Sequence, residues 1–150
     1  MLYKPLIAAA IALAAVQTAV AQITTVCNPA GTEASCTQFI ATFCNFASGV
    51  VVCIISRPRE SPKLNALKQI DPADTLTRCF TLDAAANLKC DFTALNTHTT
   101  STGISGTNCQ NVLAQVNTTC PLGGFGQVTG AAFQFYGDPN TGACGPPAGN

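Results

Sequence analysis

The stretch TLTRCFTLDAAANLKCDFTAL, residues 75–95, decides the fold. Its first arm, residues 75–83, alternates apolar and polar side chains, which is the period of a half-buried strand. Its second arm, residues 89–95, is similar in composition and follows a turn at residues 84–88. Two such runs joined by a short turn predict a β-hairpin.

A helix is expected on each side of this hairpin. Residues 36–47 place apolar side chains at helical spacing behind a capping box that runs from Ser35 to Gln38. A second capping box, from Thr107 to Gln110, opens a second helix, which Pro121 ends.

Two further strands are expected at residues 126–130 and 131–136, and turn-forming residues follow at 138–142. The resulting order is helix, two strands, helix, two strands. It predicts one small α+β domain in which the helices pack on an antiparallel sheet.

The first residues have the pattern of a secretory signal peptide. Lys4 precedes an apolar run from Leu6 to Val16, and small residues end at Ala21. The run is shorter than the roughly 20 residues that span a bilayer. We therefore expect cleavage after residue 21 and a secreted, extracellular domain at residues 22–150, with no membrane span.

The overall composition excludes several classes of protein. Seven basic residues balance seven acidic ones, and charged residues make up 9% of the chain. Nucleic-acid binding needs a clear excess of Lys and Arg, so we expect no nucleic-acid partner. The hydrophobic fraction of 47% argues against intrinsic disorder.

Nine cysteines indicate an oxidising compartment. If Cys36 and Cys44 share a helix, they lie about 12 Å apart along its axis, too far for a disulfide, so each must reach another element. Neither a C-x₂-C pair nor a histidine at ligand spacing occurs, so we expect no metal and no cofactor. The cysteines expected in disulfides are Cys27, Cys36, Cys44, Cys79, Cys90, Cys109, Cys120 and Cys144.

Residues 50–69 do not fit the rest of the chain. They join an apolar run to a charged segment broken by prolines, and they contain Cys53, the odd cysteine. We interpret them as an insertion, such as a retained intron, and the alternative is a variable loop. In either case Cys53 is a free or intermolecular thiol.

Signals for catalysis are weak. The single histidine, His98, lies in a polar run typical of an exposed loop, and the aspartates are scattered along the chain. General acid–base catalysis needs a positioned proton carrier, most often histidine, so the chain is not expected to be an enzyme. The sequon at Asn117 predicts a glycosylation site.

The C-terminal run carries the residue types that bind sugars. Amides and carboxylates bond hydroxyl pairs, and an aromatic ring stacks on the C–H face of a sugar. The residues predicted to bind a glycan are Gln127, Gln134, Tyr136, Asp138 and Asn140. The alternative is that Tyr136 simply packs at the end of a strand.

Several phrases resemble the fungal secreted glycan-binding proteins with a Y-three-like lectin domain. They are C-x₈-C-TQFIATFCN, TRCF with KCDFTALNT, NCQNVLAQV-x₃-CPLGGFGQ and GAAFQFYGDPNTGACG. The resemblance covers residues 26–145 apart from 50–69. It implies an αββαββ order, several disulfides, and lectin activity toward glycans that contain N-acetylhexosamine.

The function favoured by the sequence is therefore non-catalytic glycan binding, with glycans or glycoproteins as partners. The sequence leaves the oligomeric state open, a dimer included. A secreted cysteine-rich effector or toxin that acts on a protein or membrane is one alternative. A small hydrolase that depends on His98 is the other.

Overall fold

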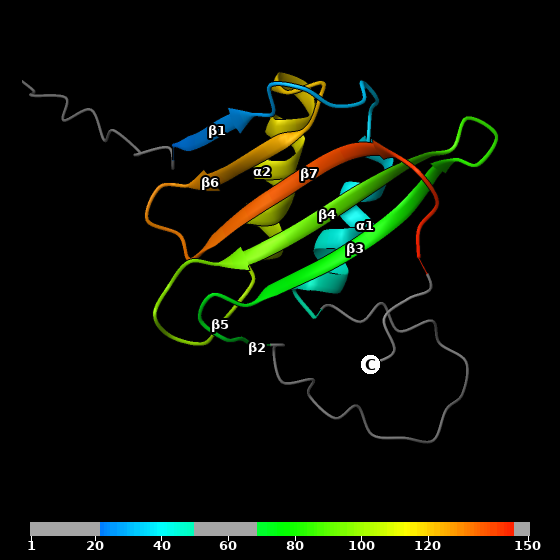
Figure 1. Ribbon diagram of the computed structural model, residues 1–150. Helices are drawn as coiled ribbons and strands as arrows, with labels where there is room; N and C mark the ends of the chain where they lie inside the picture. The colour runs from blue at the N-terminus through cyan, green and yellow to red at the C-terminus, as the bar shows by residue number, and fades with distance from the viewer. Residues whose placement is uncertain (1–21, 50–68, 146–150) are drawn as a thin grey trace, which may run out of the picture.

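The computed structural model describes residues 22–49 and 69–145. In this part of the chain, two helices pack on one face of a five-stranded antiparallel sheet, as Figure 1 shows. The predicted α+β class and the packing of helices on an antiparallel sheet are confirmed. The elements are β1 (Ile23–Cys27), α1 (Thr37–Ala47), β2 (Gln69–Ile70), β3 (Thr75–Asp83), β4 (Leu88–Asn96), β5 (Thr102–Gly103), α2 (Gly106–Thr119), β6 (Gly124–Val128) and β7 (Phe133–Thr141).

The strands of the large sheet follow the order β1-β6-β7-β4-β3. The hairpin predicted from residues 75–95 is confirmed as β3 and β4, with Thr77 opposite Thr93 in the register. Strand β1 was not predicted. It lies at the edge of the sheet beside β6, with Val26 opposite Phe125. The observed order therefore adds β1 in front of the αββαββ order that the resemblance implies, and it adds the short strands β2 and β5 on either side of the hairpin.

The last two strands were predicted with wrong bounds. The turn expected at residues 138–142 is wrong for residues 138–141, because β7 continues to Thr141 and pairs with β4 throughout. A proline at position 139 is tolerated there because the pairing of β7 with β6 extends only as far as Gly137, which lies opposite Gly124, the first residue of β6. Beyond that point β7 has a strand neighbour on one side only, and proline is found at such edges.

Both helices form where they were expected, but neither capping box does. Cys36 precedes α1 without a side-chain cap, and the Ser35 hydroxyl lies 3.0 Å from the Thr37 hydroxyl instead of accepting from the Gln38 amide. Helix α2 begins two residues earlier than predicted, because the Ser105 hydroxyl accepts from the Asn108 amide at 3.3 Å.

The hydrophobic core lies between the helices and one face of the sheet. Phe43 of α1 stacks on Phe92 of β4 with ring centroids 5.3 Å apart, and Phe80 meets Phe92 edge-on at 5.9 Å. Figure 1 shows α1 behind β3 and β4 and α2 behind β6 and β7. This arrangement buries one face of the sheet, and neither of the described helices covers the opposite face, here called the outer face.

A second, two-stranded sheet joins the segments on either side of the hairpin. Gln69 pairs with Gly103 and Ile70 pairs with Thr102. The fully buried Asn96 holds this region together, because its amide donates to the carbonyls of Ile70 and Thr100 at 2.8 and 3.0 Å. The proposed insertion at 50–69, including Cys53, lies outside the described residues except for Gln69. No helix in the described ranges is long and apolar enough to cross a membrane.

Candidate functional site

Strand β7 presents most of the predicted site residues on the outer face. Its burial alternates, with Phe133 and Phe135 in the core and the residues between them only partly buried. Because side chains along a strand point alternately to opposite faces, the second set faces away from the helices. That set is Gln134, Tyr136, Asp138 and Asn140.

The strand register places the neighbours of these residues. Tyr136 lies between Phe125 of β6 and Thr93 of β4, and Asp138 lies opposite Asp91 of β4. Together they form an open groove of about 490 Å³ on the outer face. Its walls are Asn28, Thr75, Asp91, Thr93, Leu95, Gly124, Tyr136, Asp138 and Asn140.

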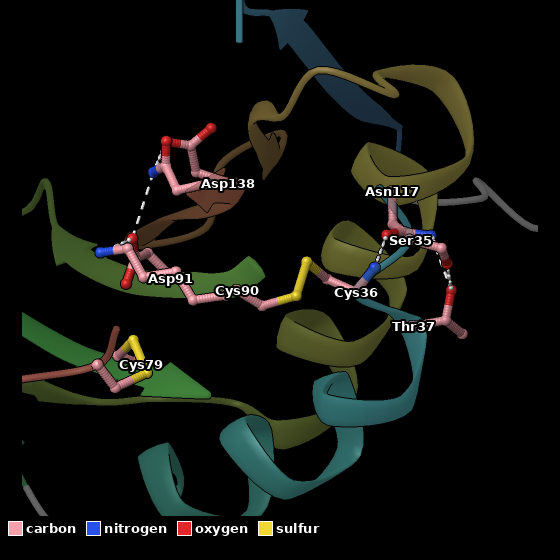
Figure 2. Close-up of a disulfide and its surroundings, with 11 residues drawn as sticks. Ser35, Cys36, Thr37, Cys79, Cys90, Asp91, Asn117 and Asp138 are labelled. Atoms are coloured by element: carbon pink, nitrogen blue, oxygen red, sulfur yellow. Dashed lines mark hydrogen bonds and ion pairs between the residues drawn. A yellow bond between two sulfur atoms is a disulfide. The ribbon is translucent and has the colours of Figure 1, made fainter. Parts of the chain in front are cut away.

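Two carboxylates lie at one end of the groove and are held by amides. Asn140 Nδ2 donates to Asp138 Oδ2 at 2.7 Å and to Asp91 Oδ2 at 3.2 Å. Asn28 Nδ2 donates to Asp138 Oδ1 at 3.1 Å, and Lys89 Nζ lies 2.9 Å from Asp91 Oδ2. Figure 2 shows Asp91 and Asp138 near one another on neighbouring strands. Both carboxylates are therefore fixed in position before any ligand binds.

Tyr136 is fixed by a chain of hydrogen bonds along the same face. Its hydroxyl donates to Gln134 Oε1 at 2.9 Å, and Gln134 Nε2 donates to Gln127 Oε1 at 3.4 Å. Gln127 Nε2 in turn donates to the carbonyl of Ala131 at 2.7 Å. The Phe125 ring lies 5.0 Å from the Tyr136 ring, centroid to centroid, at an angle of 31°.

The structure thus brings three of the five predicted residues, Tyr136, Asp138 and Asn140, into the wall of one groove. Gln134 and Gln127 lie behind Tyr136 in the hydrogen-bond chain. Sequence reasoning missed the residues from outside the C-terminal run, chief among them Asp91. The alternation in β4 could have placed Asp91 and Thr93 on one face, but only the register of β4 against β7 places them beside Asp138 and Tyr136.

His98 is exposed, in the loop after β4, and is not among the residues that line the groove. Its backbone N–H donates to Asn96 Oδ1 at 2.9 Å. The groove itself is lined by two carboxylates, amides, hydroxyls and an aromatic ring.

Four disulfides hold the scaffold of the groove. Cys36–Cys90 joins the start of α1 to β4, directly beside Asp91, as Figure 2 shows. Cys79–Cys144 ties the segment after β7 to β3. Cys44–Cys109 links the two helices, and Cys27–Cys120 links β1 to the end of α2. As expected from the helix geometry, Cys36 and Cys44 each pair with a different element.

The sequon residue Asn117 has a structural role in the last turn of α2. Its Oδ1 accepts from the backbone N–H of Cys36 at 2.8 Å, and its Nδ2 donates to the hydroxyls of Thr37 at 2.7 Å and Ser35 at 3.4 Å. Figure 2 shows this contact between α2 and the start of α1, here called the Asn117 clamp. A side chain from another helix thus bonds at the start of α1, where the sequence predicted a local capping box.

Two comparisons with known proteins identify the family of this chain. The family model of the glycan binding domain Y3 matches residues 63–144, which include Asp91, Tyr136 and Asp138. The antiviral protein CAP of Coprinus comatus is 32% identical over 114 residues, which cover 74% of this chain and 92% of that protein. This chain belongs to the glycan binding domain Y3 family.

Proposed function

We propose that this protein is a secreted, non-catalytic lectin whose outer sheet face binds glycans that contain N-acetylhexosamine. The observation that carries the proposal is the groove, in which one tyrosine ring adjoins two carboxylates already held by amides. Membership of a glycan-binding family supports the ligand class. Secretion is supported by the signal-like residues 1–21 and by four disulfides, which persist in oxidising compartments.

Rigid polar groups suit this task. A loose side chain loses binding energy when a ligand orders it, whereas a preorganised one does not. Asp138 is held on both oxygens, by Asn28 and Asn140, and it lies on a strand rather than in the turn first expected. Tyr136 is anchored through Gln134. The groove can therefore offer a ring and fixed acceptors to a sugar at little entropic cost.

The test is a titration of the purified domain with N-acetylhexosamine oligosaccharides. The double substitution Tyr136→Ala with Asp138→Ala should weaken binding at least about tenfold, which corresponds to about 1.4 kcal/mol. Thr81→Ala is the matched control, because Thr81 is an exposed residue of β3 outside the groove. A folded double variant that binds as tightly as the wild type would place the site elsewhere.

A membrane-acting toxin is not favoured by the surface. Such a protein needs an exposed apolar patch. Over residues 22–49 and 69–145, Val26 is the only exposed large apolar side chain. Vesicles loaded with a fluorescent dye should therefore remain intact when the domain is added.

A further inference from the structure

Most hydrogen-bond donors that line the groove are already bonded to other residues of the protein. An amide nitrogen has two donor hydrogens. Asn140 Nδ2 directs its two to Asp91 and Asp138, and Asn28 Nδ2 bonds Asp138 and the carbonyl of Leu122 at 3.4 Å. The Tyr136 hydroxyl donates its single hydrogen to Gln134. These groups therefore meet a ligand mainly through their oxygen atoms.

Acceptor sites remain in excess. An ionised carboxylate has about four lone-pair sites, and the bonds described above use only part of them. Asp91 Oδ1 accepts no hydrogen bond from any residue in the described ranges, and the Tyr136 oxygen keeps its lone pairs. A ligand that fills the groove must consequently bring donors, such as hydroxyl groups or the N–H of an acetamido group.

The charge of the groove also favours a ligand without anionic groups. Asp91 and Asp138 are the only charged residues among those that line it. Lys89 Nζ is paired with Asp91, 2.9 Å from its Oδ2, and Lys89 is not among the residues that line the groove. An anionic group placed in the groove would face two carboxylates and no cation among the lining residues, and like charges repel one another.

Resting on the proposed function, we propose that the groove selects uncharged, donor-rich glycans and rejects glycans that carry sulfate or carboxylate groups. Asp91 and Asp138 determine this specificity through their charge. The discrimination weakens at high ionic strength, because the groove is open and salt screens exposed charges over about 10 Å at 0.1 M.

The experiment compares two ligands that differ in one group. Calorimetric titrations would use an uncharged N-acetylglucosamine oligosaccharide and the same oligosaccharide with one sulfate, each at low and at high salt. At low salt the uncharged ligand should bind at least about tenfold more tightly, and the difference should shrink at high salt. Equal affinity for the two ligands at low salt overturns this inference and leaves the proposed function intact. Binding of neither ligand overturns both.

A charge-neutralising variant tests the assignment to Asp91. Asp91→Asn keeps the side-chain shape and removes the charge, so the ratio between the two affinities should fall to roughly threefold or less. Glu33→Gln is the control, because it changes the net charge equally but lies in a different depression, beside Asn117. If Glu33→Gln lowers the ratio as much as Asp91→Asn, the groove carboxylates do not set the specificity. If Asp91→Asn does not fold, the salt dependence of the wild type still decides the outcome.

Discussion

Replacing Asn117 with alanine removes the Asn117 clamp, and the lost contacts determine how much the unfolding free energy falls. The backbone N–H of Cys36 loses its acceptor at 2.8 Å in a residue that is only 2% exposed. A buried donor without a partner costs about 1–3 kcal/mol. The hydroxyls of Ser35 and Thr37 are exposed, so water replaces the two remaining bonds at little cost. We expect a loss of about 2 kcal/mol in unfolding free energy, or roughly 5–10 °C in Tm.

Thermal and urea unfolding followed by circular dichroism would measure this loss. Thr119→Ala is the matched control, because it abolishes the sequon but leaves the Asn117 carboxamide in place, and it should unfold like the wild type. Asn117→Asp keeps an acceptor for the Cys36 N–H and should recover part of the stability. An Asn117→Ala protein within about 0.5 kcal/mol of the wild type would refute the clamp, since that is the range of neutral surface changes.

Glycosylation at Asn117 stays a prediction, and the clamp sets its consequence. A glycan replaces one of the two Nδ2 hydrogens, so an occupied sequon loses the bond to Thr37 or to Ser35. Because both hydroxyls are exposed and the Asn117 Oδ1 still accepts from the Cys36 N–H, the glycosylated fraction of protein made in a glycosylating host should unfold at nearly the same temperature as Thr119→Ala. An unfolding temperature several degrees lower would mean that the glycan also breaks the bond to the Cys36 amide.

Three further predictions follow from the scaffold of the groove. Gly123→Ala should weaken glycan binding, since an added Cβ would collide with Asp138 Oδ1. Gly130→Ala is the control in the same titration and should leave binding unchanged, because Gly130 has a similar positive φ but no atom within 4 Å of an added Cβ. Loss of the Cys79–Cys144 disulfide by Cys79→Ser with Cys144→Ser should lower the unfolding free energy by about 4 kcal/mol, from closure of a loop that spans 65 residues, and an unchanged urea midpoint would contradict this. Tyr136→Phe should weaken binding less than Tyr136→Ala, because it loses only the hydrogen bond to Gln134 and keeps the ring beside Phe125. Equal losses of affinity in the two variants would mean that the ring does not contribute to binding.

Local patterns in the sequence correctly predicted the elements whose structure depends on residues close by in the chain. Alternation in residues 75–83 gave β3 with its observed bounds, because one face of that strand packs on the core. The helical spacing of Ile40, Phe43 and Ala47 gave α1 for the same reason. Tyr136, Asp138 and Asn140 were grouped because their residue types occur close together in the C-terminal run, although they were expected to span a strand end and a turn.

The predictions from sequence were wrong or incomplete where residues distant in the chain determine the local structure. Asp138, Pro139 and Asn140 have the composition of a turn, but pairing with β4 extends the strand through them. The pattern from Ser35 to Gln38 predicts a capping box, but Asn117, some 80 residues away in sequence, bonds the Cys36 amide instead. The position of Asp91 beside Asp138 depends on strand register, which composition does not reveal.

A ligand titration observed residue by residue would show whether the outer-face groove is the glycan site. Amide NMR spectra of the labelled domain would be recorded while an N-acetylhexosamine oligosaccharide is added. We expect the shifted signals to cluster on Thr93, Tyr136 and Asp138 and their neighbours in β4 and β7. Shifts confined to the helices, or to the loop around His98, would contradict it.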